Sequence, residues 1–309
     1  EAVTEQSAWP DPVLSYAYFI REVETRVGPQ EHIIGLRQNL PWPGTLSLKA
    51  DSARNRADAA GQAVRRERLE MIQVIKTAYF EVVYLDRALT VTREHLARLD
   101  TLEPVVRNEY VTGRTGQNAL LQLQMARERL MNRIDQLERR SVPVMDRIQA
   151  ALNLPPSTPL SVRLEPADFI EFSDDDARTW LRESHPDLKS LESLAAAAEN
   201  GVSLAERDRY PGLTLGMNYM VTGDARMAGV EDSGKDPFNV SLSLNIPVSR
   251  RYNAAERRAR LQEAAARDRL HAAGNRLDTM LSDALFAYRD ALSTVRLHTE
   301  SLIPLAEQT

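Results

Sequence analysis

Cysteine is absent from all 309 residues, so neither a disulfide framework nor thiol chemistry is available to this chain. No stretch approaches the ~18 apolar residues that a membrane-spanning helix requires. Any contact with the interior of a membrane would therefore have to be made by strands. No signal peptide is visible at Glu1, and we interpret the chain as a mature or trimmed product.

Signatures of catalysis and of nucleic-acid binding are missing as well. No serine–histidine–aspartate set, paired-carboxylate cleft, glycine-rich phosphate loop or zinc motif stands out, and the five histidines lack the spacing of ligands. The net charge is −5, and basic residues alternate with acidic ones rather than forming a patch. We therefore expect no enzyme, no cofactor, no bound metal and no nucleic-acid partner.

What the chain does contain is a strand with two different faces. From Phe238 to Ile246, just before Pro247, apolar side chains occupy every second position and asparagine or serine the positions between them. A looser run from Ile33 to Leu40 ends at Pro41, and a long helical stretch follows each proline. The two prolines lie 206 positions apart, and the same shift aligns four alanines and a phenylalanine of each half. This pattern predicts an internal duplication of strand, strand and long helix.

The remaining patterns divide the chain into segments. A heptad of apolar positions runs from residue 120 to residue 151 and predicts a coiled-coil seam, so the helices on either side of its turn should pack antiparallel. We expect the polar segment 21–31 to form the turn of the first strand pair. The predicted segments are a first β-hairpin at 11–40, a helical hairpin at 45–153 with its tip near 111–117, an irregular segment at 154–172, a helix at 173–209, a second β-hairpin at 210–247 and a long helix at 250–309.

The length of the strands favours a membrane pore over a soluble sheet. Strands of about nine residues match the ~9–11 that cross an outer-membrane bilayer. A soluble sheet packed on a core is the commoner arrangement, but no other sequence is left to cover the apolar face. We predict that the lumen is lined by Thr214, Gly216, Asn218, Asn239, Ser241, Ser243 and Asn245. We predict that the lipid is contacted by Leu213, Leu215, Tyr219, Phe238, Val240, Leu242 and Leu244.

A barrel built from these strands requires more than one copy of the chain. Four strands cannot close a barrel, and open sheet edges are not tolerated in lipid. Small barrels need about eight strands or more, which two or three copies would supply. The predicted fold class is an α+β membrane protein, in which long antiparallel coiled-coil helices form an α-barrel and two β-hairpins per chain contribute to a shared transmembrane β-barrel.

Several motifs occur in an order that resembles a known family. They are PDPVLSY at 10–16, VGPQE at 27–31, QNLPWPG at 38–44, YVTG at 110–113, LNLPPSTPL at 152–160, SHPDLKSL at 184–191, RYPGLTLG at 209–216 and LNIPV at 244–248. Each motif is weak alone, but the ordered set is specific and covers nearly the whole chain. On these residues the chain resembles the outer-membrane efflux protein family, the TolC-like exit ducts of Gram-negative bacteria.

The resemblance implies a homotrimer with a twelve-stranded barrel in the Gram-negative outer membrane and helices that extend into the periplasm. It also implies an inner-membrane pump and a periplasmic adaptor as partners. The first helical tip would dock the adaptor through Tyr110, Gly113, Arg114, Thr115, Gln117 and Asn118. The family's helix before the first hairpin and its returning helix after the last are missing, so we interpret the chain as a fragment. The motifs RVGPQ and LPWPG resemble cation-efflux members, which favours export of metal ions or small drugs.

The main hypothesis is a passive exit duct of a tripartite efflux or type I secretion system, and two alternatives remain. A periplasmic adaptor also combines a helical hairpin with β structure, but it should carry a compact domain of many short strands. A soluble coiled-coil scaffold should tolerate an aspartate at Val240 or Leu242. A duct should not tolerate it, because both side chains would face lipid.

Overall fold

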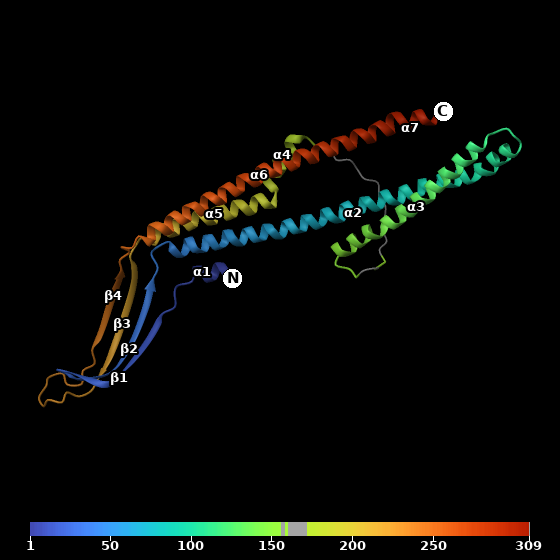
Figure 1. Cartoon of the computed structure of the whole chain (residues 1–309). Coiled ribbons are helices and arrows are strands. Elements are labelled where there is room, and N and C mark those ends of the chain that lie inside the picture. Colours follow the sequence, from blue (N-terminus) through green and yellow to red (C-terminus); the bar gives the residue numbers. More distant parts are fainter. Residues whose placement is uncertain (156–157, 160–171, 309) are drawn as a thin grey trace. The chain divides into compact units, whose positions relative to one another are not determined.

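The computed structural model describes residues 1–155, 158–159 and 172–308 (Figure 1). The chain forms two compact units, one made of Glu1–Ala63 with Phe172–Thr309 and the other of Val64–Glu171. The helix α2 (Thr45–Val111) contributes residues to both units. Most of the segment 154–172, which we predicted to be irregular, lies outside the described residues.

The first unit contains a four-stranded antiparallel sheet in the order β1-β2-β3-β4 (Figure 1). Its strands are β1 (Val13–Thr25), β2 (Gly28–Leu40), β3 (Gly212–Thr222) and β4 (Phe238–Asn245), and the short helix α1 (Ala2–Ser7) precedes them. The central pair joins the two hairpins, because β2 aligns with β3 from Leu40 opposite Leu213 to Gln30 opposite Thr222. Two hairpins that are far apart in the sequence therefore form one continuous sheet.

The first hairpin is longer than we predicted from the sequence. The segment 21–31, predicted to be a turn, continues both strands, and only Arg26 and Val27 lie between them. Gly28 begins the returning strand with φ +134°, a conformation that residues with a side chain rarely adopt. The Thr25 hydroxyl donates a hydrogen bond to the Gly28 carbonyl at 2.6 Å and closes the turn. The polar composition of 21–31 thus belongs to strand ends that project beyond the apolar part of the sheet.

Three helices of this unit start or finish at the same end of the sheet (Figure 1). The helix α2 follows β2, α5 (Pro186–Arg207) precedes β3, and α6 (Arg251–Leu297) follows β4. The helices α5 and α6 pack along each other around a core of Leu188, Ala273 and Leu277. Among the described residues, no helix is both long enough and apolar enough to cross a membrane.

The beginning of α2 is held against α5 by side-chain hydrogen bonds to the backbone. The buried Ser52 hydroxyl donates to the Ala197 carbonyl at 3.3 Å, and the Ser190 hydroxyl donates to the Ala59 carbonyl at 3.2 Å. Ala197 and Ala59 are themselves buried. Small residues at these positions let the two helices approach closely enough for serine to reach the opposite backbone.

The helix that we predicted over 173–209 is two helices in the structure, α4 (Asp174–Ser184) and α5. Ser173 caps α4 as its sequence indicates, because its hydroxyl accepts a hydrogen bond from the Asp176 amide at 3.1 Å. The break falls at His185, which is extended (φ −68°, ψ 123°) since the ring of Pro186 disfavours a helical conformation in the residue before it.

The long helix predicted over 250–309 contains one irregularity within the described residues. The helix α6 is followed by a π-helical turn, η1 (His298–Leu302), and then by the short helix α7 (Ile303–Glu307). Pro304 has no backbone N–H to donate to the preceding turn, which is a physical reason for the local change in hydrogen bonding.

The second unit is an antiparallel pair of helices, the later part of α2 and α3 (Gln117–Ala151) (Figure 1). Its core consists of Ala78 and Leu85 from α2 with Leu137, Val144 and Ile148 from α3. The three α3 residues all belong to the predicted heptad seam. Ion pairs flank this core, with Arg127 to Asp100 at 2.8 Å and Arg93 to Glu138 at 2.7 Å.

Glu81 of α2 is clamped by two arginines of α3 and makes the pairing of these helices sensitive to pH. Its carboxylate accepts hydrogen bonds from Arg140 at 2.8 Å and from Arg147. These bonds, first the one from Arg140, hold the pKa of Glu81 below its ordinary value of 4.5. Because the pKa of Glu81 is lower in the folded state than in the unfolded state, its ionised carboxylate stabilises the fold at pH values above the ordinary pKa. This stabilisation is lost as the pH falls through the lower pKa of the folded state.

We therefore expect Glu81→Gln to lower the melting temperature of the helix pair at pH 7 and to leave it nearly unchanged at about pH 3. Circular dichroism of both proteins at the two pH values measures this difference. Glu94→Gln, at an exposed position of the same helix, is the control. An equal destabilisation by Glu81→Gln at both pH values would show that the ion pairs are not its cause.

Candidate functional site

The register of the sheet separates its side chains into an apolar face and a polar face. Across β3 and β4, Leu215 lies opposite Leu242, and Gly216 lies opposite Ser241. Since successive residues of a strand point to opposite sides, the apolar face carries Leu213, Leu215, Tyr219, Phe238, Val240, Leu242 and Leu244. The polar face carries Thr214, Gly216, Asn218, Asn239, Ser241, Ser243 and Asn245. The residues predicted to share a face are thus brought together.

The first hairpin extends both faces, a contribution that our sequence analysis did not assign to individual residues. Its apolar side includes Leu14, Tyr16, Ile34 and Leu36, and its polar side includes Ser15, Arg37 and Asn39. Its alternation is looser because the polar residues His32 and Gln38 fall on the apolar face. The face of each β2 residue follows from the register of β2 against β3, and the sequence of the first hairpin alone does not reveal that register.

Close packing on the polar face occurs where glycines leave room. A Cβ placed on Gly35 would lie 2.5 Å from the Ser15 hydroxyl and 2.6 Å from the Asn218 side-chain oxygen. The Asn218 amide also donates a hydrogen bond to the Asn239 side chain at 3.0 Å. Side chains from β1, β3 and β4 therefore form a polar row across the glycine of β2.

The apolar face is open to solvent in the single chain. Leu14 is 73% exposed, Val240 61% and Leu242 63%. Contiguous apolar surface of this extent is uncommon on soluble monomers and marks a site of contact with protein or membrane. None of the described helices of the first unit lies over these side chains.

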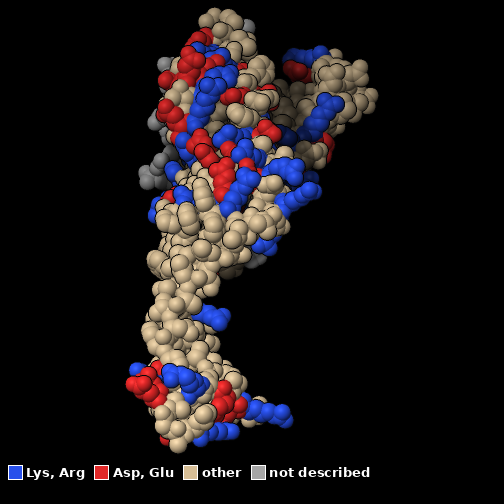
Figure 2. Space-filling model, turned by 90° about the vertical axis from the view of Figure 1, so that its left-hand side faces the viewer, with Lys and Arg blue, Asp and Glu red and all other residues tan. Residues whose placement is uncertain are grey.

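Charged side chains are almost absent from the central part of the sheet. The spans 13–20, 33–40, 212–222 and 238–245 contain no acidic residue, and Arg37 is their only basic residue. Figure 2 shows this part of the molecule as a largely uncharged band with basic and acidic groups beyond it at both ends. The first unit therefore has an uncharged zone on both faces of the sheet, bounded by charge.

Aromatic side chains gather at both borders of this zone. At the border near the hairpin turns, the Tyr16 hydroxyl lies 2.8 Å from Nδ1 of His32, and the rings of Tyr16 and Tyr18 lie 5.8 and 5.1 Å from the His32 ring. At the border near the helices, Trp42 stacks on Tyr210 with ring centroids 5.1 Å apart.

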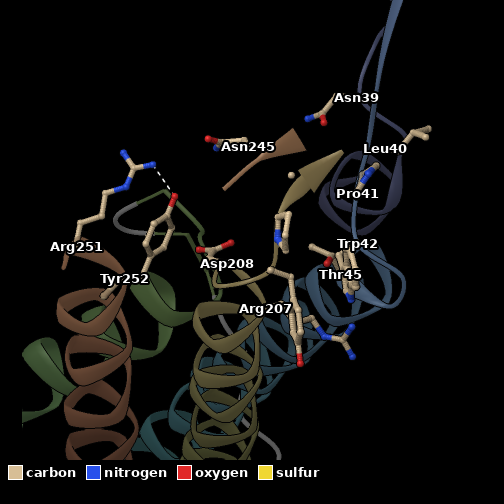
Figure 3. Close-up of a pocket in the computed structure, with 14 residues that line it drawn as sticks. Asn39, Leu40, Pro41, Trp42, Thr45, Arg207, Asp208, Asn245, Arg251 and Tyr252 are labelled. Carbon is tan, nitrogen blue, oxygen red and sulfur yellow. Dashed lines mark hydrogen bonds between the residues drawn. The ribbon is translucent and has the colours of Figure 1, made fainter. Parts of the chain in front are cut away.

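A cavity of about 520 Å³ lies where the strands pass into the helices (Figure 3). Arg207, one of its lining residues, donates a hydrogen bond to the Pro43 carbonyl, which ties the entry into β3 to the exit from β2. On the opposite side Arg251 donates to the Tyr252 hydroxyl at 2.7 Å. The Thr45 hydroxyl is buried without a hydrogen-bond partner among the described residues. The cavity thus joins all three strand–helix connections.

The loop between β3 and β4 folds onto the first hairpin. The Gly234 and Gly223 amides donate to the carbonyls of Val27 and Pro29, each at 2.8 Å. Arg226 forms ion pairs with Glu22 and Glu24 at 2.9 and 3.3 Å. These contacts fasten the free ends of the two hairpins to each other.

Asp236 fixes the base of the same loop. It accepts hydrogen bonds from the Tyr219 hydroxyl and from the Thr222 amide, the latter at 2.8 Å. These two donors, the Tyr219 hydroxyl first, hold the pKa of the Asp236 carboxyl below its usual value. Asp236 therefore keeps its negative charge to a lower pH than an aspartate without these donors.

The predicted docking tip is an exposed turn between α2 and α3. Gly113 has φ +73°, its amide donates to the Tyr110 carbonyl at 3.0 Å, and the Arg114 amide donates to the Glu109 carbonyl at 2.8 Å. This is the Schellman arrangement that ends helices at a left-handed glycine. Arg114, Gln117 and Asn118 are exposed and Thr115 is half-buried. The tip thus presents polar side chains from a rigid backbone.

The two glycines of this tip allow a matched test of its rigidity. We expect Gly113→Ala to destabilise the turn by about 1 kcal/mol, because the Cβ of alanine is sterically unfavourable in a left-handed backbone conformation. Gly116→Ala should be nearly neutral, since Gly116 has φ −83° and open space around it. Hydrogen exchange of the Gly113 and Arg114 amides measures the opening of the turn. Equal protection of these amides in the two variants would contradict our expectation that alanine is strained at position 113.

Among the residues that the structure describes, no three His, Cys, Asp or Glu side chains lie close enough together to hold a metal ion. The candidate functional features of the chain are an amphipathic sheet, a cavity at the junction of that sheet with the helices, and an exposed helical tip.

Comparison with known proteins identifies this arrangement as a known fold. No family model matches the sequence. The structure resembles the outer membrane protein VceC from Vibrio cholerae, with a TM-score of 0.74 at 15% identity, over 99% of this chain and 75% of that one. It resembles the CmeC outer membrane channel of Campylobacter jejuni with a TM-score of 0.64 at 13% identity, over 99% and 69% of the two chains. The open state of the MtrE outer membrane channel of Neisseria gonorrhoeae also has a TM-score of 0.64, at 14% identity, over 99% and 72%.

One relative is recognised from sequence. It is the toxin and drug export protein A of Aggregatibacter actinomycetemcomitans, 21% identical over 180 residues, which are 58% of this chain and 39% of that protein. The matched part thus spans well under half of that relative. The chain has the fold of TolC-like outer-membrane channels, as its motifs predicted, and two of the three solved structures named above are described as outer membrane channels.

Proposed function

We propose that this chain is a subunit of a passive exit duct in the Gram-negative outer membrane, with its sheet in the bilayer and its helices in the periplasm. The observation that carries this proposal is the four-stranded sheet whose central part is free of acidic residues, with one exposed apolar face and one polar face. An apolar face suits lipid, and a polar face suits a water-filled lumen. The predicted lipid-facing and lumen-lining residues take these two roles in the proposal.

The height of the apolar zone fits a bilayer. The seven residues from Leu213 to Tyr219 span about 20 Å at ~3.3 Å per residue, and the apolar band of an outer-membrane barrel is about 25 Å tall with aromatic girdles at both interfaces. The Tyr16–His32–Tyr18 group and the Trp42–Tyr210 stack occupy the positions of such girdles. The charged ends of the hairpins and of the helices would then lie in water on either side.

The free edges of the sheet support a shared barrel. Within the described residues β1 and β4 each pair with one neighbour, so each leaves a row of backbone groups without partners. Such an edge costs several kcal/mol per unsatisfied group in lipid. Pairing of β4 in one copy with β1 in the next removes both edges, and three copies give twelve strands. We propose this homotrimer. We also propose that the two halves of the chain arose by an internal duplication.

The helical tip and the known relatives suggest the partners and the cargo. We propose that the tip from Tyr110 to Asn118 docks a periplasmic adaptor, which connects the duct to an inner-membrane pump that supplies the energy. The relative named for toxin and drug export supports small molecules as cargo, and metal ions are the second candidate because of the cation-efflux motifs. Polar, exposed side chains on a rigid turn suit reversible docking of another protein.

The test of this proposal is the mass and the conductance of the full-length gene product. Extraction of the membrane fraction in mild detergent, followed by light scattering with the detergent subtracted, should give a trimer. The purified trimer should form water-filled conductances in a planar bilayer. A monomer or dimer that needs no detergent would contradict the duct and favour the coiled-coil scaffold.

A further inference from the structure

One charged side chain stands alone on the polar face of the sheet. Arg37 of β2 lies opposite Gly216 of β3, and Gly216 lies opposite Ser241 of β4. The four strand spans around it contain no acidic residue. The Arg37 side chain is exposed and forms no hydrogen bond or ion pair with any described residue. Its charge is therefore not neutralised by this chain.

Two of the neighbours of Arg37 on the polar face are glycines. A Cβ on Gly216 would lie 2.6 Å from the Ser241 hydroxyl, which is too close, and 3.7 Å from the Arg37 Cγ, which is an ordinary contact. Gly35, two positions earlier on the same strand and face, also lacks a side chain. The guanidinium can thus extend from the face, and the nearby groups are hydroxyls and amides rather than carboxylates.

Arg37 lies in the middle of the uncharged zone. Gly216, its partner, is near the centre of β3 (Gly212–Thr222). A basic residue on the lipid side at this depth would cost roughly 2–4 kcal/mol. Arg37 is instead on the face that carries the asparagines and serines, where water can hydrate it.

We propose that Arg37 makes the lumen of the duct selective for anions. This inference rests on the proposed trimer, in which three copies of Arg37 form one ring at a single depth. Rings of arginine or lysine are the usual means by which pores favour anions. With low-dielectric lipid around the lumen and no carboxylate in the same zone, the field of the ring is weakened only by salt. The duct therefore passes anionic solutes more readily than cationic solutes of equal size.

The experiment is the reversal potential of the full-length trimer in a planar bilayer under a KCl gradient. At about 0.1 M salt, where the Debye length is about 10 Å, chloride should permeate faster than potassium. Arg37→Gln should lower the chloride-to-potassium permeability ratio by about twofold or more, and Arg37→Glu should bring it below one. Arg37→Lys keeps the charge and should keep the ratio above one.

Controls distinguish the ring from a general change of charge and from a failure of the duct. Arg26→Gln removes an exposed basic group from the β1–β2 turn beyond the uncharged zone and should leave the ratio close to that of the wild type. The proposal is overturned if the wild type prefers potassium, or if Arg37→Glu leaves the ratio unchanged while it conducts normally. Absence of conductance in the wild type itself would instead overturn the proposed duct.

Discussion

Leu242→Arg is expected to prevent assembly of the sheet in the outer membrane, whereas Ser243→Arg, one residue further along the same strand, is expected to be tolerated. Leu242 lies on the apolar face and is 63% exposed in the single chain. In the proposed barrel its side chain meets the hydrocarbon near the midplane, where an arginine costs roughly 2–4 kcal/mol in every chain. Ser243 lies opposite Thr214 on the polar face, where water solvates the added charge.

The two variants differ only in the face that receives the charge, so they control for strand propensity and for expression. The yield of trimer in the membrane fraction, relative to the wild type, is the measurement. Leu242→Asp should give a smaller loss than Leu242→Arg, because acidic residues on the lipid face cost less than basic ones. Equal yields from Leu242→Arg and Ser243→Arg would mean that the apolar face does not contact lipid.

Val144→Asp is expected to disrupt the packing of α2 against α3. Val144 is 0% exposed and lies in the core with Leu85, Leu137 and Ile148. An aspartate there buries a carboxylate among aliphatic side chains without a partner, which costs roughly 4 kcal/mol or more. We expect earlier loss of the helical circular dichroism signal on heating and rapid cleavage of this helix pair by trypsin.

The matched control is Gln136→Asp, which adds the same carboxylate at an exposed position of the same helix. It should change the melting temperature little, since exposed substitutions usually fall within about 0.5 kcal/mol. If Val144→Asp were as stable and as resistant to trypsin as Gln136→Asp, the seam of the helix pair would lie on another face of α3.

The parts of this fold that could be predicted from sequence are those encoded by neighbours along the chain. The alternation of β4 fixes its two faces, because each residue from Phe238 to Asn245 obeys it. The cap at Ser173 needs only the residues that follow it. The seam of α3 is visible because its apolar residues repeat over several heptads, and three of them lie in the core.

Features that depend on distant pairing could not be predicted in the same way. The polar composition of 21–31 indicated a turn, but two projecting strands close it with only Arg26 and Val27 between them. Arg37 received no role because the loose alternation of β2 does not reveal its face until β3 is aligned beside it. The interruption at His185 had a local signal in Pro186, which our prediction of one helix over 173–209 did not use.

The pairing of β2 with β3 also determines the order in which the chain can fold. Leu40 and Leu213 are opposite each other although the whole of α2, α3, α4 and α5 separates them in sequence. The first hairpin is synthesised early and must keep an open edge until β3 emerges, and contacts between such distant residues form slowly. An apolar strand with an unpaired edge is prone to aggregate during this interval. For the proposed duct we therefore expect the time for which the first hairpin remains unpaired, rather than the stability of the finished sheet, to determine whether the chain needs a chaperone before insertion.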